Sequence, residues 1–318
     1  MRLFSWWVIF LSLLTSTVVY GQRTPRSAAA YIKRGHERLK AGDYDGAIAD
    51  YTKAIGLDPR NDEAYFARGS VRYEKKDFDG SILDFSKVIE IKPRDGVAYN
   101  SRGLARHDKG DVVGAIADYG KAIEINPRDA VVYYNRALAL FANRDVDLAV
   151  ADFDKAIEIK PEYVEAYYNR GRIRDAKGDY DGAIADYSKI IEIQPEDAAG
   201  YNNRGIALVA KGDYPRAIAD FTKVIELEPG SSDGYFNRGN ARDKAGEIEG
   251  AIADFDKAIE LDAGNARAHA LRGLAKLKQG KDAEAQQDLD TALKLNGKMK
   301  VKLDKMADEI RKNRKPKE

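Results

Sequence analysis

The sequence predicts an all-α protein, built as a solenoid of antiparallel helix pairs. Prolines recur at intervals of 34 residues, an aromatic residue opens each interval, and small residues return at fixed places within it. The recurring prolines are Pro59, Pro93, Pro127, Pro161, Pro195 and Pro229. Self-similarity at a fixed period of about 20–50 residues is the signature of repeat architectures, in which each copy is one supersecondary unit.

One copy shows why each unit should form two helices. Tyr167, Gly171 and Arg174 follow helical spacing, which places them on one face of a first helix. Gly178 then ends that helix. Pro195 stops the second helix, because proline lacks an N–H and disfavours helix in the residue before it. Each unit is therefore predicted to be a helix, a tight turn, a second helix and a proline stop.

A large side chain recurs on the second helix and needs cover on two sides. The set is Tyr51, Phe85, Tyr119, Phe153, Tyr187, Phe221, Phe255 and Leu289. Small residues such as Gly171 and Ala183 allow the two helices of one unit to approach closely. Each ring buries roughly 150–250 Å², worth about 4–6 kcal/mol gross at ~25 cal/mol per Å². One hairpin cannot enclose such a ring alone, so the hairpins are expected to stack.

The order Tyr-x2-Arg-Gly, then Ala-x3-Tyr/Phe, then Pro resembles the tetratricopeptide repeat. The resemblance covers eight units, residues 28–297, which begin at Ala28, Asp62, Gly96, Ala130, Val164, Ala198, Ser232 and Ala266. It implies a right-handed superhelix with a concave groove lined by the first helices. It also implies a protein that binds peptides or proteins in that groove and has no catalysis of its own.

Arginine stands three residues after the opening aromatic position in all eight units, where the family most often has leucine. These are Arg34, Arg68, Arg102, Arg136, Arg170, Arg204, Arg238 and Arg272. An aspartate recurs on the second helix, as Asp50, Asp84, Asp118, Asp152, Asp186, Asp220, Asp254 and Asp288. In an antiparallel hairpin the two positions fall at about the same height, which predicts a structural Arg–Asp ladder. The alternative is a row of arginines that faces an acidic ligand.

Asparagine precedes that arginine in four consecutive units, as Asn135, Asn169, Asn203 and Asn237. This resembles the asparagine ladder of superhelical repeat proteins that hold an extended peptide by its backbone, since an amide both donates and accepts hydrogen bonds. Family position also places five rings on the inner wall, Phe66, Tyr134, Phe141, Tyr168 and Phe236. These nine residues are the predicted partner-binding site. The alternative is that the asparagines only tolerate a wet helix face and the rings belong to the core.

Composition and spacing predict no catalytic residue, cofactor or metal site. The three histidines, His36, His107 and His269, occupy three different places in distant units. Acidic residues recur once per unit, which marks architecture rather than one active site. The chain has 53 basic and 52 acidic residues, so its net charge does not favour binding to nucleic acid. It has no cysteine, so no disulfide can form.

Residues 1–21 have the composition of a secretory signal peptide, since residues 3–20 carry no charge and follow a basic start. Cleavage after Gly21 would deliver the chain to the periplasm, and residues 22–27 would form a short linker. The alternative is that residues 3–20 remain as a membrane anchor.

Residues 298–318 are expected to form a capping helix and a basic tail. Val301, Leu303, Met306, Ala307 and Ile310 make a weak apolar stripe at helical spacing. The favoured function is a non-catalytic interaction scaffold of the cell envelope that holds a partner protein or extended peptide in the groove. The alternative is an accessory subunit whose basic tail contacts membrane lipid or nucleic acid.

Overall fold

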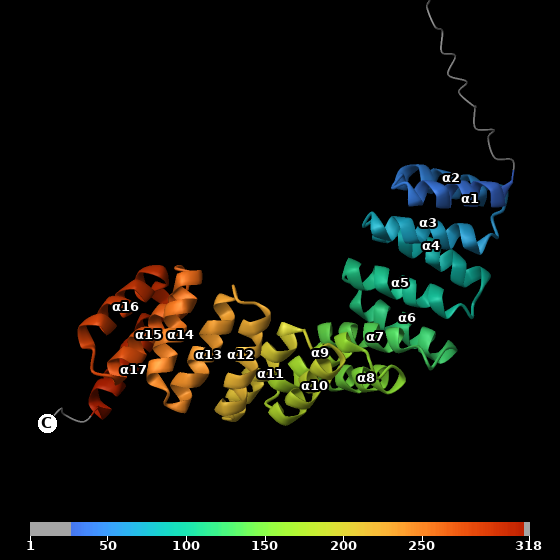
Figure 1. Cartoon of the computed structure of the whole chain (residues 1–318). Helices are drawn as coiled ribbons and strands as arrows, with labels where there is room; N and C mark the ends of the chain where they lie inside the picture. The colour runs from blue at the N-terminus through green and yellow to red at the C-terminus, as the bar shows by residue number, and fades with distance from the viewer. Residues whose placement is uncertain (1–26, 315–318) are drawn as a thin grey trace, which may run out of the picture. The chain divides into compact units, whose positions relative to one another are not determined.

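A computed structural model describes residues 27–314. This part of the chain holds seventeen α-helices, one short 3-10 helix and no strand, and consecutive helices form hairpins (Figure 1). The fold is therefore an all-α solenoid, as the sequence predicts. The predicted signal peptide, most of the predicted linker and the last four residues of the tail lie outside the described residues.

The chain divides into two compact units, residues 1–101 and 102–318, and the division falls inside α5. The first unit holds α1 (Ala28–Lys40), α2 (Tyr44–Leu57), α3 (Asp62–Glu74), α4 (Phe78–Ile91) and the start of α5 (Gly96–Lys109). The second holds the rest of α5, then α6 (Val112–Ile125), α7 (Ala130–Ala142), α8 (Val146–Ile159), α9 (Val164–Ala176), α10 (Tyr180–Ile193), α11 (Ala198–Lys211), α12 (Tyr214–Leu227), α13 (Ser232–Ala245), α14 (Ile248–Leu261), α15 (Ala266–Lys278), α16 (Asp282–Leu295), η1 (Gly297–Met299) and α17 (Lys300–Asn313).

Local signals set the ends of the helices, as the hairpin of α9 and α10 shows. Gly178 has a φ of 80°, a backbone conformation that glycine adopts without strain. The next residue, Asp179, caps α10, since its Oδ1 accepts a hydrogen bond from the backbone N–H of Gly182 at 3.0 Å. Helix α10 ends two residues before Pro195, where the proline stop predicts its end.

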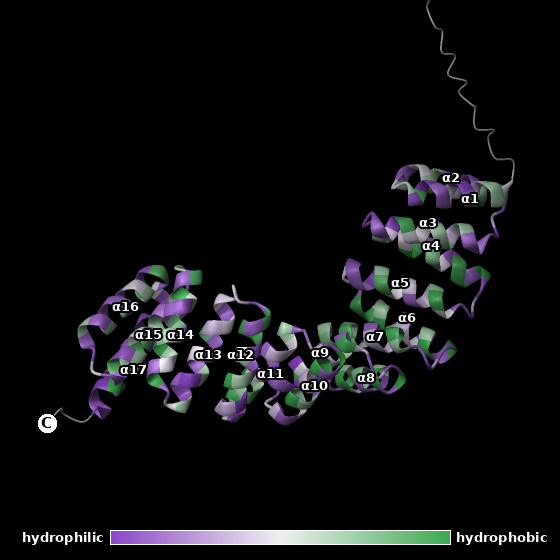
Figure 2. Cartoon of the chain, in the orientation of Figure 1, coloured by the Kyte–Doolittle hydropathy of each residue, from purple (hydrophilic) through white to green (hydrophobic). Residues whose placement is uncertain are grey.

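The recurring large side chains of the second helices form the core. Among them, Tyr51, Phe153 and Phe255 have no exposed surface. A Cβ on Gly171 would approach the ring of Tyr187 to 3.0 Å, so the missing side chain makes room for that ring. The helices of the second unit carry hydrophobic and hydrophilic residues side by side (Figure 2), because each helix turns one face to its neighbours and another to solvent.

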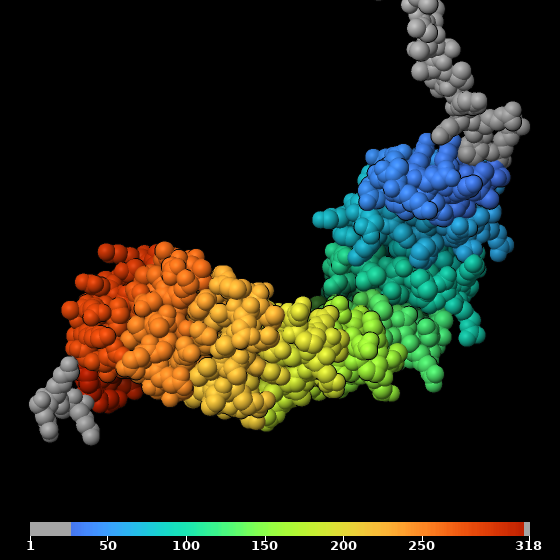
Figure 3. Space-filling view, viewed as in Figure 1, coloured from blue at the N-terminus to red at the C-terminus, as the bar shows by residue number. Residues whose placement is uncertain are grey.

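Neighbouring hairpins share one core, which is why they stack. In the second unit a single cluster joins Tyr167, Tyr187, Leu208 and Phe221, from α9, α10, α11 and α12. Within this unit the hairpins follow one another in chain order, as the sequence of colours from green to red shows (Figure 3). Each hairpin is therefore buried mainly by the one before and the one after it.

Helix α17 closes the last hairpin, so the predicted capping helix is confirmed. Its residues Leu303 and Ala307 are buried in a cluster that contains Leu274 and Leu277 of α15. Beyond its end, Nη1 of Arg314 donates a hydrogen bond to the carbonyl oxygen of Leu277 at 3.1 Å. The helix thus covers apolar side chains that a ninth hairpin would otherwise cover.

Candidate partner-binding surface

Every hairpin contains the predicted Arg–Asp pair, in bidentate form. In the fifth hairpin, Nε of Arg170 donates to Oδ2 of Asp186 at 3.0 Å, and Nη2 donates to Oδ1. The same two bonds join Arg34–Asp50, Arg68–Asp84, Arg102–Asp118, Arg136–Asp152, Arg204–Asp220, Arg238–Asp254 and Arg272–Asp288. All eight aspartates are buried. The arginines therefore bind carboxylates inside the fold, and the alternative of a row that faces an acidic ligand is wrong.

At two of the buried carboxylates, Asp50 and Asp288, these bonds favour the ionised form. The hydrogen bond from Arg34 lowers the pKa of the Asp50 carboxyl, although burial acts in the opposite direction. At Asp288, burial alone would raise the pKa, but hydrogen bonds from Arg272 and Lys276 outweigh it and lower the pKa.

The same arginines also tie successive hairpins together, a role that the sequence analysis missed. Nη1 of Arg204 donates to Oγ of Ser188 on the preceding hairpin at 3.1 Å, and Nη1 of Arg170 contacts Asp154 at 2.5 Å. Equivalent bonds join Arg68–Thr52, Arg238–Thr222 and Arg272–Asp256. The signal was present in the sequence, because a short polar residue directly follows the large core residue in most units.

The four predicted asparagines are all partly exposed on the first helices of the second unit. Two of them bond to the first helix of the preceding hairpin: Nδ2 of Asn169 donates to the hydroxyl of Tyr134 at 3.2 Å, and Nδ2 of Asn237 donates to Oδ1 of Asn202 at 2.9 Å. The side-chain oxygen of Asn169 accepts no hydrogen bond from residues 27–314. The amide row thus couples neighbouring hairpins and still presents an acceptor to the surface.

The predicted rings differ in how much surface they offer. Tyr134 and Tyr168 are partly buried, and the hydroxyl of Tyr168 donates to Asp197, the N-terminal cap of α11. Burial, followed by this bond, raises the pKa of Tyr168. Phe66 is partly buried too, but it belongs to the first unit, where it lines a separate pocket of about 520 Å³.

The prediction that Phe236 offers its ring to a partner is wrong. Only 3% of Phe236 is exposed, because its ring packs on Phe255 with centroids 6.1 Å apart. From the other side, the guanidinium of Arg267 on α15 lies 4.6 Å from the ring centroid. Phe236 is therefore part of the core of the seventh hairpin.

Phe141 and Asn169 meet in one apolar pocket of about 290 Å³ between the fourth and fifth hairpins. Phe141 lies near the C-terminal end of α7, and half of its surface is exposed to solvent. The pocket is lined by Leu138, Phe141, Val146, Phe153, Asn169, Arg172, Ile173, Ala176 and Lys177. The predicted partner-binding site contained only two of these residues, Phe141 and Asn169, because the others come together only when α9 packs beside α7 and α8.

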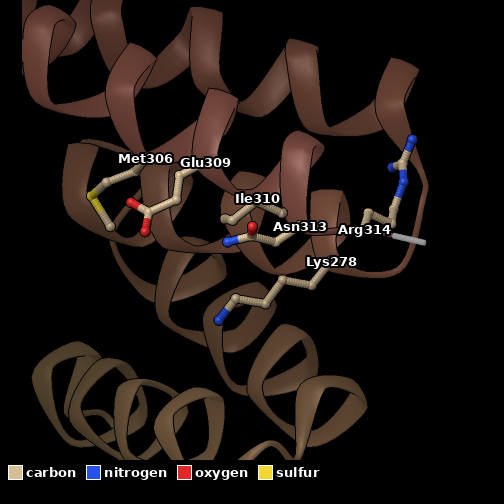
Figure 4. Close-up of a pocket in the computed structure, with 6 residues that line it drawn as sticks. All are labelled: Lys278, Met306, Glu309, Ile310, Asn313 and Arg314. Carbon is tan, nitrogen blue, oxygen red and sulfur yellow. The ribbon is translucent and has the colours of Figure 1, made fainter. Parts of the chain in front are cut away.

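A second pocket, of about 450 Å³, lies where α17 meets the end of α15 (Figure 4). Met306, Glu309, Ile310 and Asn313 of α17 line it together with Lys278 of α15 and Arg314. Both of its cations already have carboxylate partners: Lys278 contacts Asp243 at 2.7 Å, and Arg314 contacts Asp282 at 2.8 Å. No aromatic residue lines this pocket, whereas the half-exposed ring of Phe141 lines the other.

The repeats match models of a known family along most of the described chain. A model described as tetratricopeptide repeat matches residues 134–198, 202–266 and 236–298, and a second with that description matches residues 62–95. A model described as TPR repeat matches residues 35–76 and 103–143. The chain belongs to the tetratricopeptide repeat family. The comparison with curated proteins found no match.

Solved structures of tetratricopeptide repeat proteins share the fold. A crystal structure of MamA is 28% identical, with a TM-score of 0.50 over 52% of this chain and 96% of its own. YrrB, described as a TPR protein with an unusual peptide-binding site, is 24% identical, with a TM-score of 0.53 over 58% of this chain and 95% of its own. The C-terminal part of a repeat protein from Cytophaga hutchinsonii is 19% identical, with a TM-score of 0.65 over 75% of this chain and 98% of its own.

No helix among residues 27–314 is long and apolar enough to cross a membrane. The same range contains no group of three or more histidine, cysteine or acidic residues arranged to hold a metal ion.

Proposed function

We propose that this tetratricopeptide repeat protein is a non-catalytic scaffold that binds an extended segment of a partner protein on the first helices of its second unit. The observation that carries the proposal is the pocket in which the half-exposed ring of Phe141 lies beside Asn169. An exposed ring over an apolar pocket is the kind of surface that partner side chains bury.

The surroundings of the pocket support a peptide rather than a small polar ligand. Val131 on α7 and Ile206 on α11 add exposed apolar surface near the same row of first helices. Asn135, Asn169 and Asn203 recur at intervals of one hairpin, and an amide can bond to peptide N–H and C=O groups without reading the side chains. Regular amides beside an apolar pocket suit a backbone held in line with one side chain anchored.

The cell envelope is the proposed location. Its support is the uncharged run of residues 3–20 after a basic start, with delivery to the periplasm after cleavage or anchoring without it. The alternative function is contact of the basic tail with lipid or nucleic acid, but two cations at the end of the described tail already have carboxylate partners. There Arg311 lies 3.4 Å from Asp308, and Arg314 pairs with Asp282.

A photo-cross-linking residue at position 141 tests the proposal in envelope extract. The matched control carries the same group at position 148, because Leu148 is an equally exposed apolar residue on the second helix α8. We expect a partner that cross-links at position 141 and not at 148, and that is lost when Asn169 and Asn203 are both changed to alanine. Equal capture at both positions, or capture that ignores the asparagines, would move the binding surface away from the first helices.

A further inference from the structure

The residue eight places after the opening aromatic points toward the first helix of the following hairpin. In the fourth hairpin this residue is Phe141, which lines the pocket between α7 and α9. In the seventh it is Asp243, whose carboxylate contacts Nζ of Lys278 on α15 at 2.7 Å. A side chain at this place therefore lies against the following hairpin. In the seventh hairpin, where the side chain is acidic, it pairs with a lysine of that following hairpin.

The fifth hairpin has an acid at the same place without the lysine. Asp175 stands where Phe141 and Asp243 stand in their hairpins, and its Oδ1 is buried with no hydrogen-bond partner among the described residues. Lys278 follows Asp243 by 35 residues, and the residue that follows Asp175 by 35 is Ala210. The position that corresponds to Lys278 therefore carries only the methyl group of Ala210, which cannot neutralise Asp175.

The elements packed around Asp175 bring no other cation to it. On its own helix, Arg172 forms no ion pair with it, and on α11 Lys211 is engaged with Asp181 and Arg204 with Asp220. Burial raises the pKa of Asp175, as expected for a carboxyl that has lost water without gaining a partner. Burial, and then the charge of Asp175, raise the pKa of Tyr187 to about 12.

We propose that Asp175 and the exposed position of Ala210 form a subsite for a cationic side chain, lysine or arginine, of the bound partner segment. The inference rests on the proposed function and names the chemistry of the partner. The partner's cation would stand where Lys278 stands beside Asp243, and it would pair with the partly exposed carboxylate of Asp175.

The neighbouring pocket adds a second requirement at a defined spacing. Phe141 and Asp175 occupy the same place in consecutive hairpins, whose helices pack roughly 10 Å apart. An extended chain advances about 3.3 Å per residue. The partner segment should therefore carry an apolar or aromatic residue and a lysine or arginine roughly three positions apart.

Selection from a displayed library of random peptides tests the subsite, with the chain from Gln22 onward as the target. We expect the selected peptides to be enriched in lysine or arginine close to an apolar residue. The Asp175→Asn chain should still select the apolar residue but lose the preference for a cation. Asp233→Asn is the matched control, because it removes an exposed acid from the first turn of α13 and should leave the preference intact.

A lysine introduced into the chain itself, beside Asp175, gives a second and independent test. In the Ala210→Lys chain the new amine should bond Asp175 as Lys278 bonds Asp243, so a selected peptide should bind about tenfold more weakly, or about 1.4 kcal/mol. The same peptide with its cation replaced by glutamine should bind the original and the Ala210→Lys chain equally. Circular dichroism of each variant would show that the chain is folded.

The outcomes separate this inference from the function on which it rests. Peptides that bind the first helices without a cation, or a cation preference that survives Asp175→Asn, would overturn the subsite and leave the scaffold standing. Failure to select any peptide would overturn both.

Discussion

Two aspartates of the hairpin formed by α9 and α10 have opposite effects on stability, because one has hydrogen-bond donors and the other does not. Asp186 is almost fully buried, yet it receives two hydrogen bonds from Arg170 and one from Arg174 at 3.0 Å. Asp175, on the facing helix, has a buried oxygen with no donor. A buried carboxylate whose two oxygens both receive donors stabilises one arrangement of the chain, whereas one with an oxygen that lacks a donor costs stability that a ligand can return.

The ladder predicts strong coupling between Arg170 and Asp186. Replacing Asp186 with asparagine, or Arg170 with methionine, should each destabilise the chain by up to about 3–5 kcal/mol, because each breaks the bidentate bond of a buried charge and leaves that charge with only its weaker second partner, Asp154 or Arg174. The double variant should lose less than the sum of the two. Urea denaturation of the four chains measures the coupling.

The control is Lys189 and Glu192, a solvent-exposed pair on the same hairpin. There the cycle should give a coupling of at most about 1 kcal/mol. A similarly small coupling for Arg170 and Asp186 would mean that the ladder only accompanies the packing.

The pKa directions predict acid sensitivity with a definite sign. Asp50 and Asp288 have folded pKa values below the ordinary value of 3.8, so the unfolded chain binds more protons in the range below it. Their stabilising contribution is complete above about pH 5 and is lost as the pH falls through about 4 toward their folded pKa values. The unfolding free energy from pH 7 to 3 should fall less steeply for Asp50→Asn.

Asp175 should show the reverse dependence. Its folded pKa is raised, so the folded chain binds more protons above pH 3.8, and its contribution to stability declines as the pH rises through its folded pKa. The difference in unfolding free energy between Asp175→Asn and the parent chain should therefore grow in favour of the variant from pH 4 to pH 7. A difference that shrinks over this range would contradict the raised pKa.

At the scale of the helix hairpin, one place in the stack lacks a bond that its neighbours have. Arg170 and Arg204 reach back to Asp154 and Ser188, but the residue that faces Arg136 is Gly120. A Cβ on Gly120 would lie 4.0 Å from Nη1 of Arg136, with no closer obstacle. The joint between the third and fourth hairpins therefore has room for the missing tie.

Gly120→Asp should supply that tie and stabilise the chain by about 1 kcal/mol. Part of the gain comes from removing a helical glycine and part from a partly exposed ion pair with Arg136. Gly120→Ala captures only the first part. In an Arg136→Met background the alanine gain should persist and the aspartate gain should shrink by about 0.5–1 kcal/mol, as measured by thermal or urea unfolding. An aspartate gain unaffected by Arg136→Met would show that no tie forms.

The sequence predicted the turn, the stop and the ion pair within one hairpin. The cap at Asp179, the stop at Pro195 and the pairing of Arg170 with Asp186 depend on separations that the 34-residue period keeps constant. Contacts between hairpins depend on the register in which one first helix packs on the next. Phe236 is covered by Arg267 of the following hairpin. Lys278, which pairs with Asp243, follows it by 35 residues, one more than the repeat length, and this register is visible only in the packed structure.

At the scale of the whole molecule, stability should depend on the order of the hairpins, because each is buried by its neighbours and an end hairpin lacks one of them. At the C-terminal end of the second unit, α17 packs where the missing neighbour would lie. Leu303 is 4% exposed against the last hairpin, whereas Val301, two residues earlier on the same helix, is 83% exposed. The two positions form a matched pair for testing the cap.

Leu303→Ser should detach the cap, because it removes buried apolar volume and places a hydroxyl among Leu274 and Leu277. We expect a loss of about 2–5 kcal/mol in the protection that α17 gives its neighbour, whereas Val301→Ser should change nothing measurable. Hydrogen exchange followed by mass spectrometry would report the loss helix by helix. Since contacts run from neighbour to neighbour, exchange should rise first in α15 and α16 and least in α9 to α12. A uniform rise through the second unit would instead show that its hairpins unfold together, and the cap would then stabilise the unit as one cooperative body.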